Sequence, residues 1–595
     1  MLFFVCLGAI LAPASQDWRP GWNGRSKTPL MGWRPWNSFR NNIDQETQQL
    51  ISDALAVRNR TVAGESGLVS LFDLGYSDVG IDEGWEFIGP KNRSMHDKEG
   101  NPLIDLSTFP NLTALADHVH SNNQTISWYL NSCAFGGPKN DSLTNYEGDV
   151  RALIRYGFDG VKIDGCGKMN NMTLYASLMR ASNHSFAIEN CHGGGDVDQG
   201  QNGLLPTTNY CPWNRFRTSN DIQAFVEAWF WNMQTTLPYL DSEHPISQPS
   251  CWAYPDMLET GLVREPARSA SEVQPTHPMP WNRAHFGGWV IVSSPLILGL
   301  NILNQTQLEA VIDVIGNREA IRINQEWAGH PGTLAHQWSG KDLPIPNATY
   351  VWSLPCDEED ESQLGWEYNA LTQTLARQRH DTHGQGYVSY DQSLASTLLT
   401  LTSSESMTGL STRFVYDNVT RTLGNPSGYV TPPYSGRGIC LASFGWQLPT
   451  CGDTPSAKMY ACLGDQTDQK WVLNSNGTVS NDCGQCLATR HVPQSPDTSV
   501  QLWIKPQLPS EDGSPRVAAL LINNSPWTFN ATIDFELLKL NRSEKNDQID
   551  NFTSNASARV RDVWMRRDFE NSFRNKFIYN LPSFDSGLFI FKFTK

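Results

Sequence analysis

The stretch GFDGVKIDGCG, residues 157–167, places two carboxylates, one amine and one thiol between glycines. The apolar residues Val161 and Ile163 alternate with polar ones, which is the two-residue period of a β-strand, and the glycine that follows ends the run. The polar positions, Lys162 and Asp164, therefore project from one face of the strand. Two interpretations are open: a structural ion pair, or a catalytic carboxylate held by a neighbouring cation.

Other polar residues occupy the same kind of position, at the C-terminal ends of strand-like runs: Asp82, Glu83, Tyr129, and the pair Cys191-His192. From about residue 28 to 327 such runs alternate with helix-like stretches such as YEGDVRALIRYG. This alternation favours a (β/α)₈ barrel, whose active site lies at the C-terminal rim of its strands. Asp159 precedes its strand, so we expect it to be structural.

Composition and charge exclude several classes of protein. The 595-residue chain is long enough for two or three domains, and its net charge of −16 disfavours nucleic acid or an anionic membrane as a partner. No later segment is long and apolar enough to span a bilayer. The 21 tryptophans suit stacking on sugars, but they equally suit core packing.

Several features predict export. Residues 1–15 have the short apolar run and small residues of a signal peptide, although no basic residue precedes them. Sixteen Asn-X-Ser/Thr sequons indicate a glycosylated surface. Eleven of the 12 cysteines follow the signal segment, so we expect disulfides with one cysteine left over.

Beyond about residue 330 strand-like runs follow one another without helices, which predicts an antiparallel β-domain over 328–435 and 506–595. Residues 436–505 look like a cysteine-rich insert in which Gln469 and Trp471 resemble the Gln-X-Trp motif of ricin-type β-trefoil lectins. A disulfide-stapled structural insert and a sugar-binding module both remain open. We expect the following cysteines to pair within the insert: Cys440, Cys451, Cys462, Cys483 and Cys486.

Six motifs occur in an order and spacing that resemble glycoside hydrolase family 27: TPLMGWRPWNSF, IDEGW, VKIDGC, FRTSNDI, PDMLETG and SSPLILGLNI. The family contains α-galactosidases and α-N-acetylgalactosaminidases. The resemblance runs from about Thr28 to Gln325 and resumes in the last strands. It implies a catalytic (β/α)₈ barrel followed by an antiparallel β-sandwich, and a retaining mechanism that needs two carboxyl groups roughly 5–5.5 Å apart.

The resemblance assigns these two carboxyl groups. Asp164 matches the nucleophile of the Lys-X-Asp motif, and Asp221 matches the general acid/base. Arg217 resembles the arginine that helps to hold the 2-position of the sugar. Asp221 needs a raised pKa to stay protonated. It could instead cap the N-terminus of a helix that begins with IQAFVEAW.

The substrate contacts implied by the resemblance are Trp36 as a stacking platform, with Asp82, Glu83, Tyr129, Lys162 and Asp256 as polar partners of a galactose-type ring. It further implies disulfides Cys133–Cys166 and Cys191–Cys211, each tying an active-site loop to its neighbour. No metal or cofactor is expected, because two carboxyl groups suffice for the reaction.

Two positions depart from the galactosidase pattern. Glu83 stands where the family usually has a second aspartate, a change found in its β-L-arabinopyranosidases. His192 stands where a glutamate faces the 2-hydroxyl, and its charge depends on pH; it does not resemble the small residues that accommodate an N-acetyl group.

Three functions are therefore considered: a retaining α-galactosidase, a β-L-arabinopyranosidase with the same machinery, and a carbohydrate-binding protein without activity. A homodimer is compatible with the sequence, as is either a secreted or a vacuolar/lysosomal destination.

Overall fold

The computed structural model describes most of the chain: residues 23–87, 95–131, 142–165, 169, 171–191, 206–222, 226–262, 279–339, 350–356, 360–379, 385–391, 399–402, 410–425, 439–443, 457–462, 467–490, 499–525, 528–540, 552 and 556–594. Cys133, Cys166, His192, Cys451 and the predicted signal segment 1–15 lie outside these residues. No helix among the described residues is both long and apolar enough to cross a bilayer.

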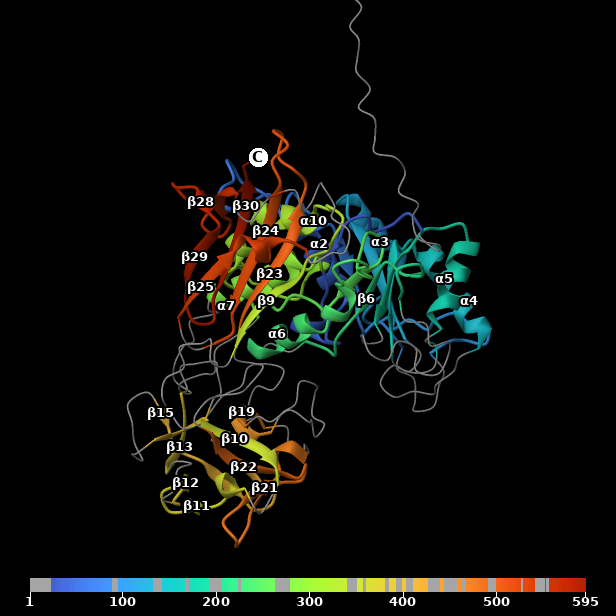
Figure 1. Ribbon diagram of the computed structural model, residues 1–595. Coiled ribbons are helices and arrows are strands. Elements are labelled where there is room, and N and C mark those ends of the chain that lie inside the picture. The colour runs from blue at the N-terminus through green and yellow to red at the C-terminus, as the bar shows by residue number, and fades with distance from the viewer. Residues whose placement is uncertain are drawn as a thin grey trace, which may run out of the picture.

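Eight parallel strands form the N-terminal part of the molecule: β1 (Met31–Trp33), β2 (Asp78–Gly80), β3 (Thr125–Leu130), β4 (Gly160–Asp164), β5 (Ala187–Cys191), β6 (Arg215–Arg217), β7 (Trp252–Tyr254) and β8 (Leu296–Leu298). They pair in chain order, and β1 also pairs with β8. A bridge closes the ring just after β7, since the Leu258 amide donates to the Ile297 carbonyl over 2.7 Å. The predicted TIM-like barrel is confirmed (Figure 1).

Helices cover this barrel: α1 (Trp36–Phe39), α2 (Gln45–Ala56), α3 (Leu112–Ser121), α4 (Leu143–Tyr156), α5 (Met172–Ala181), α6 (Val226–Gln234), α7 (Met279–Ile291), α8 (Gln305–Glu309), α9 (Ile312–Ile315) and α10 (Arg318–Gln325). Polar side chains cap several N-termini; Asn111 and Asn171 each accept a hydrogen bond from a backbone amide of the first turn. Leu115 and Val119 of α3 show the buried apolar stripe expected at helical spacing.

The local sequence explains how β4 is placed. Helix α4 ends at Gly157, whose φ of 82° is a left-handed conformation that favours glycine. Asp159 then accepts a hydrogen bond from His120 and one from the Ile126 amide, at the N-terminal end of the strand, as its structural interpretation predicted. Gly160 is needed for close packing, because a Cβ there would lie 2.6 Å from Ser127 Oγ.

Several tryptophans of the barrel pack in its hydrophobic core. Trp33, Trp85, Trp128 and Trp289 are each at most 1 % exposed and belong to the main hydrophobic cluster of the barrel. The stacked rings of Trp128 and Phe158, with centroids 4.9 Å apart, show how these side chains pack. A high tryptophan content is therefore weak support for sugar binding in this chain.

The C-terminal sandwich has a main sheet containing β9 (Thr333–Ser339), β23 (Ser499–Gln507), β24 (Arg516–Asn523), β26 (Ser557–Asp562), β27 (Arg567–Asp568), β28 (Phe573–Arg574) and β30 (Ser586–Phe593). A second sheet pairs β25 (Phe529–Asp534) with β29 (Lys576–Leu581). One face of the main sheet packs on the barrel helix α7, where Gly287 leaves room for Leu520 and Trp564. The predicted antiparallel β-region is confirmed.

Residues 350–490 form a separate set of strands with its own core, apart from the barrel in Figure 1. The strands are β10 (Tyr350–Pro355), β11 (Trp366–Asn369), β12 (Thr374–Arg377), β13 (Gly386–Asp391), β14 (Leu399–Thr402), β15 (Leu410–Ser411), β16 (Val415–Asp417), β17 (Thr422–Asn425), β18 (Ile439–Ala442), β19 (Lys458–Ala461), β20 (Trp471–Leu473), β21 (Val479–Asn481) and β22 (Gln485–Arg490). The predicted insert boundaries of 436 and 505 are therefore wrong. The strands of 350–425 pack with this unit, whereas 499–505 belong to the sandwich.

This unit has an approximate threefold repeat. The backbone amides of Trp366, Phe414 and Trp471 each donate to a carbonyl in the turn of another repeat, over 2.9, 2.7 and 2.7 Å respectively. The hydroxyls of Tyr368 and Tyr416, two residues after an aromatic residue of this set, each donate to the carbonyl of the next one. A ring of equivalent contacts explains why the segment folds as one unit.

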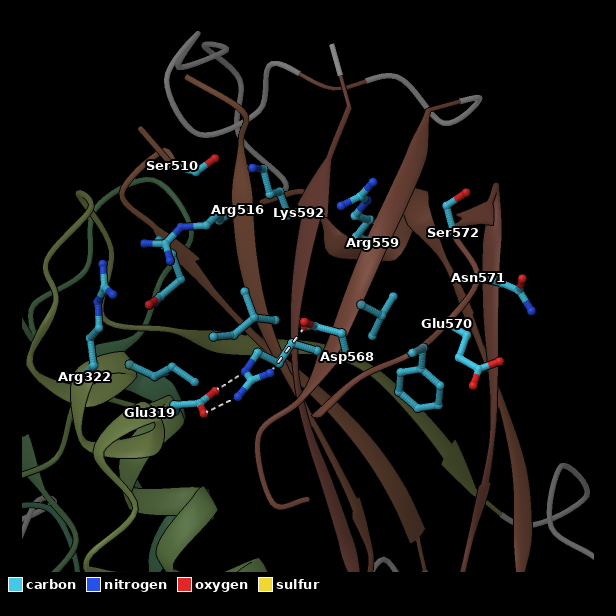
Figure 2. Close-up of a pocket in the computed structure, with 16 residues that line it drawn as sticks. Glu319, Arg322, Ser510, Arg516, Arg559, Asp568, Glu570, Asn571, Ser572 and Lys592 are labelled. Atoms are coloured by element: carbon cyan, nitrogen blue, oxygen red, sulfur yellow. Dashed lines mark hydrogen bonds and ion pairs between the residues drawn. The ribbon is translucent and has the colours of Figure 1, made fainter. Parts of the chain in front are cut away.

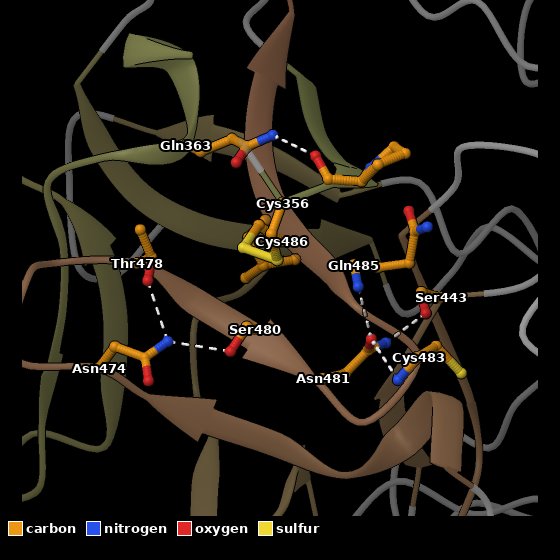
Figure 3. The surroundings of a disulfide bond; sticks show 12 residues. Cys356, Gln363, Ser443, Asn474, Thr478, Ser480, Asn481, Cys483, Gln485 and Cys486 are labelled. Atoms are coloured by element: carbon orange, nitrogen blue, oxygen red, sulfur yellow. Dashed lines mark hydrogen bonds between the residues drawn. A yellow bond between two sulfur atoms is a disulfide. The ribbon is translucent and has the colours of Figure 1, made fainter. Parts of the chain in front are cut away.

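Disulfides connect this unit internally. Cys440 pairs with Cys462 as expected, but Cys486 pairs with Cys356, which lies upstream of the predicted insert (Figure 3). The prediction that Cys486 pairs within 436–505 is wrong, because β22 lies beside β10 and brings Cys486 to its end. Cys483 is also in a disulfide. Such bonds are typical of chains that fold in an oxidising compartment.

Candidate active site

The C-terminal rim of the barrel gathers the predicted polar residues around Lys162. This lysine, on β4, forms an ion pair of 2.8 Å with Asp82, which follows β2, and both side chains are buried. The ammonium also lies 5.0 Å from the centre of the Tyr129 ring. Burial alone would lower the pKa of Lys162, but the carboxylate of Asp82 holds it well above its usual value. Lys162 is therefore a fixed positive charge in the pocket.

Asp164 is held by neutral donors rather than by the lysine. Its Oδ2 atom accepts a hydrogen bond of 2.7 Å from the Tyr129 hydroxyl, and its Oδ1 atom accepts one of 2.7 Å from the Gly165 amide. Asn131 in turn donates to the Tyr129 oxygen over 2.9 Å. Both interpretations of the KID run placed Lys162 beside Asp164, but the ion pair of Lys162 in the structure is with Asp82. Burial and, as the second cause, the negative charge of Asp164 raise the pKa of Tyr129 well above its usual value. The phenol therefore keeps its proton and remains a hydrogen-bond donor.

Arg217, at the end of β6, joins two carboxylates. One guanidinium nitrogen lies 2.8 Å from Asp256 Oδ2 and 3.2 Å from Asp221 Oδ1. The Asp256 side chain is 4 % exposed, whereas that of Asp221 is 65 % exposed. The structure thus brings Asp256, which the sequence analysis took from a different motif, to the same guanidinium as Asp221.

The two carboxyl groups differ in their affinity for a proton. Burial raises the pKa of Asp256 to about 6, although Arg217 works in the opposite direction. Desolvation also acts to raise the pKa of Asp221, but the charges of Arg217 and Lys162 outweigh it, so this pKa lies below its ordinary value. The raised pKa that a general acid needs is thus not present at Asp221 in the free protein.

Asp256 has a strained backbone, with φ at 92°, a region that residues other than glycine rarely adopt. Its carboxylate compensates by accepting hydrogen bonds from the amides of Ile222 and Met257, over 2.8 and 2.7 Å. The Trp289 indole donates to its carbonyl over 2.6 Å. Strain held by so many contacts is typical of a functional position.

Two further predicted sugar contacts, Trp36 and Glu83, lie among the described residues. Trp36 lies on α1, directly after β1, and packs against Tyr254 and Met257, with the Arg40 guanidinium 5.3 Å from its ring centre. Glu83 is partly exposed, and its amide donates to Asp82 Oδ1 over 3.0 Å. Glu83 therefore lies beside the buried Asp82–Lys162 pair, and Trp36 contacts the cluster that contains Met257, the neighbour of Asp256 in the chain. His192 lies outside the described residues.

Sequence analysis missed two buried carboxyl groups in the same motifs. Glu86, of the IDEGWEF run, is 2 % exposed; one oxygen accepts from the Gly84 amide, and the other has no partner among the described residues. Burial raises the pKa of Glu86 to about 8. Glu259, of PDMLETG, accepts a hydrogen bond from Asn37, and burial holds its pKa well above the usual range. In the sequence, the only sign of each of these carboxyl groups was an acidic residue within a run whose other residues are mostly buried.

The predicted Cys191–Cys211 disulfide is wrong. Cys211 pairs with Cys251, the residue that precedes β7, and the two Cα atoms are 6.1 Å apart. Cys191 is a buried free thiol whose sulfur accepts a hydrogen bond of 3.3 Å from Arg217. The end of β5 turns its cysteine toward Arg217, inside the rim, so it is not available to Cys211. The predicted Cys133–Cys166 pair lies outside the described residues.

Comparisons with solved structures agree with this fold. The structure is similar to α-galactosidase I from Mortierella vinacea, with a TM-score of 0.53 and 16 % identity over 96 % of this chain and 98 % of that one. It is also similar to a β-L-arabinopyranosidase from Geobacillus stearothermophilus, with a TM-score of 0.50 and 11 % identity over 95 % and 96 % of the two chains. At these identities the likeness concerns the fold alone.

Comparisons of sequence are more specific. The α-galactosidase of Oryza sativa subsp. japonica is 26 % identical over 363 residues, which cover 59 % of this chain and 75 % of the rice protein. The α-N-acetylgalactosaminidase of Gallus gallus is 29 % identical over 335 residues, covering 52 % and 73 %. The family model Melibiase_2, described as alpha galactosidase A, matches residues 28–326, half of the chain and the whole of the barrel. The protein therefore belongs to the melibiase family of glycoside hydrolases, as its six motifs predicted.

Proposed function

We propose that the protein is a retaining exo-glycosidase that hydrolyses terminal α-D-galactosyl residues of oligosaccharides or glycoconjugates. One arrangement carries the proposal: Asp164, oriented by Tyr129, ends β4, and Asp221, held by Arg217, follows β6 at the same rim of the barrel. Two carboxyl groups are sufficient for glycoside hydrolysis, so the proposal includes no metal or cofactor.

The reaction is a double displacement. The ionised Asp164 attacks the anomeric carbon while Asp221 gives its proton to the departing glycosidic oxygen, which leaves a covalent galactosyl–enzyme. Asp221, now ionised, takes a proton from water as the water oxygen attacks the same carbon and releases Asp164. Two inversions at one carbon give net retention.

Substrate binding supplies the proton affinity that Asp221 lacks in the free protein. A sugar in the pocket covers the exposed Asp221 carboxyl, and the loss of water raises the pKa of a carboxyl group. Asp256 shares Arg217 with Asp221 and competes for its charge when ionised. Both effects favour a protonated Asp221 in the complex.

The remaining residues hold the sugar. Trp36 provides the ring for stacking on the C–H face, and the fixed Asp82–Lys162 pair offers both an acceptor and a donor to neighbouring hydroxyls. Arg217 holds the 2-position, and Asp256 is a further polar partner of the sugar. These buried, mutually paired groups hold their geometry before the substrate arrives, as effective catalysis requires.

Glu83 motivates a second candidate, a β-L-arabinopyranosidase. Its extra methylene extends the carboxylate toward the place of the C6 hydroxymethyl, which L-arabinopyranose lacks. We expect kcat/KM for p-nitrophenyl α-D-galactopyranoside to exceed that for p-nitrophenyl β-L-arabinopyranoside, and Glu83→Asp to increase the ratio further. A preference for the arabinoside would overturn the galactosidase assignment.

The third function considered, a carbohydrate-binding protein without activity, was motivated by the Gln-X-Trp motif. Gln469 and Trp471 are 1 % and 0 % exposed, and the Trp471 indole donates to the Leu441 carbonyl over 2.8 Å. These side chains therefore serve the core of the 350–490 unit rather than a glycan. A carbohydrate-binding protein without activity predicts no hydrolysis by the wild type, which the same nitrophenyl assay detects directly.

The disulfides and the density of sequons support a lumenal location, either secreted or vacuolar/lysosomal. We expect the protein isolated from its source to lose apparent mass on treatment with an endoglycosidase. An unchanged mass would contradict passage through the secretory pathway.

A further inference from the structure

A groove of about 980 Å³ lies at the border between the barrel and the sandwich (Figure 2), and none of its lining residues belongs to the candidate active site. Helix α10 forms one wall, and strands β24, β30 and β26 form the floor. A space of this size suits a small ligand rather than a macromolecular interface.

Three cations cross the floor in register. Lys592 on β30 lies directly opposite Arg516 on β24 on one side and directly opposite Arg559 on β26 on the other. Residues opposite each other in antiparallel strands project from the same face, and like charges in such positions destabilise a sheet. A row of three across adjacent strands needs negative charge to balance it.

Two members of the row have a carboxylate partner. Arg516 lies 3.1 Å from Glu326, and Lys592 lies 2.7 Å from Asp512. The third, Arg559, has an exposed side chain whose guanidinium makes no hydrogen bond or ion pair with any residue that the structure describes. The neighbouring Arg561 is already engaged by Glu319, with two contacts of 2.5 and 2.6 Å. One uncompensated guanidinium therefore remains at the edge of the groove.

Charge and shape identify the class of ligand. The chain as a whole carries −16, so this group of cations is a local feature that does not follow from its composition. Arginine binds carboxylate and sulfate oxygens through two parallel N–H donors. The lining also includes the partly exposed Phe569. Figure 2 shows the side chains of Asn571 and Ser572 on the side of Arg559 that lies away from Arg516, with the carboxylate of Glu570 beside them. An aromatic ring with amide and hydroxyl groups suits a sugar ring and its hydroxyls.

We propose that this groove binds the anionic substituent, carboxylate or sulfate ester, of an acidic glycan, with Arg559 as its principal contact. The long-range negative field of the protein repels polyanions such as nucleic acid, whereas a single charged sugar fits the local row. Binding here would hold a glycan on the enzyme without occupying the catalytic pocket. The proposal does not depend on which sugar Asp164 attacks.

Binding is tested by calorimetric titration of the full-length protein carrying Asp164→Asn, so that no probe is hydrolysed. The probes are a tri-galacturonic acid, a sulfated galactose trisaccharide and a neutral galactotriose. We expect one or both acidic probes to bind with an affinity that falls as salt is raised, and the neutral probe to bind more weakly at this site. The two acidic probes distinguish carboxylate from sulfate.

Arg559→Gln should weaken binding of the acidic probe at least about tenfold, because a charge-assisted hydrogen bond is lost. Arg574→Gln is the matched control, since Arg574 is an exposed arginine of the same sheet that does not line the groove. Thermal unfolding checks that both variants are folded. Equal affinities for acidic and neutral probes, or equal losses in the two variants, would overturn the proposal.

Discussion

The hydroxyl of Tyr129 donates a hydrogen bond of 2.7 Å to Asp164 from the neighbouring barrel strand. Tyr129 lies opposite Lys162 in the β3–β4 pairing, so its side chain reaches across to the carboxylate two residues further on. Lys162 forms its ion pair with Asp82 instead. The candidate nucleophile consequently has a neutral partner that orients it and leaves its negative charge available for attack.

Replacement of Asp164 tests its role as nucleophile. Asp164→Asn should reduce kcat for an aryl galactoside on the order of 10⁴-fold, because no covalent intermediate can form. Asp164→Gly with added azide should then yield a β-galactosyl azide, which product analysis by NMR detects. Formation of the α-azide would contradict a retaining mechanism.

Replacement of Tyr129 tests the orientation of the nucleophile. Tyr129→Phe removes a hydrogen bond to a charged group, and we expect kcat to fall about tenfold or more with KM changed much less. Asn131→Ala, which removes only the donor to Tyr129, should have a smaller effect of the same kind. A larger effect of Asn131→Ala than of Tyr129→Phe would contradict this hierarchy.

Glu86 should make stability depend on pH. Its pKa of about 8 in the folded protein lies above that of the unfolded chain, so the folded state binds the extra proton and stability falls as pH rises from about 4.5 to 8. Glu86→Gln should flatten this part of the profile and raise the free energy of unfolding at pH 8 by a few kcal/mol.

Denaturant unfolding at pH 5 and pH 8 measures the difference, with Glu511→Gln as the control at an exposed carboxylate. A Glu86→Gln profile as steep as that of the wild type would show that the buried carboxyl is already ionised at neutral pH.

Cys211–Cys251 closes a loop across 40 residues of sequence. Its loss in Cys251→Ala should lower the free energy of unfolding by about 3–4 kcal/mol on the chain-entropy model. Peptide mapping after alkylation of the denatured, unreduced protein should show a modified Cys191 and a crosslinked Cys211–Cys251 peptide. A Cys191–Cys211 peptide would contradict the structure.

The sequence was sufficient for the barrel, because the alternation of strands and helices is a local feature. The same pattern predicted that Asp82 and Asp164 lie at strand ends, whereas Trp36, Asp221 and Asp256 were taken from the resemblance to the family. It indicated which face Lys162 occupies but not its partner, since Asp82 lies 80 residues away in the chain. The low pKa of Asp221 was equally inaccessible, because it depends on how much water and positive charge surround one carboxyl group in the folded protein.

Errors elsewhere have equally specific causes. The cysteine-rich composition led to an insert boundary near 436, although the repeat begins at Trp366. The repeats are joined by backbone hydrogen bonds from aromatic residues to turns distant in the sequence, which cysteine spacing does not reveal. Cys191 was paired with Cys211 by resemblance, whereas the register of β5 and β6 turns its thiol to Arg217. Pairing of distant cysteines depends on tertiary geometry that spacing does not encode.

The 350–490 unit begins after β9 and ends before β23, and these two strands pair with Ser339 directly opposite Ser499. Paired residues in antiparallel strands lie only about 5 Å apart, so the unit leaves and rejoins the sandwich at one point. A short hairpin loop could bridge that gap in its place. The catalytic part and the inserted part are thus separable modules, which evolution or engineering can exchange without altering the register of the sheet between them.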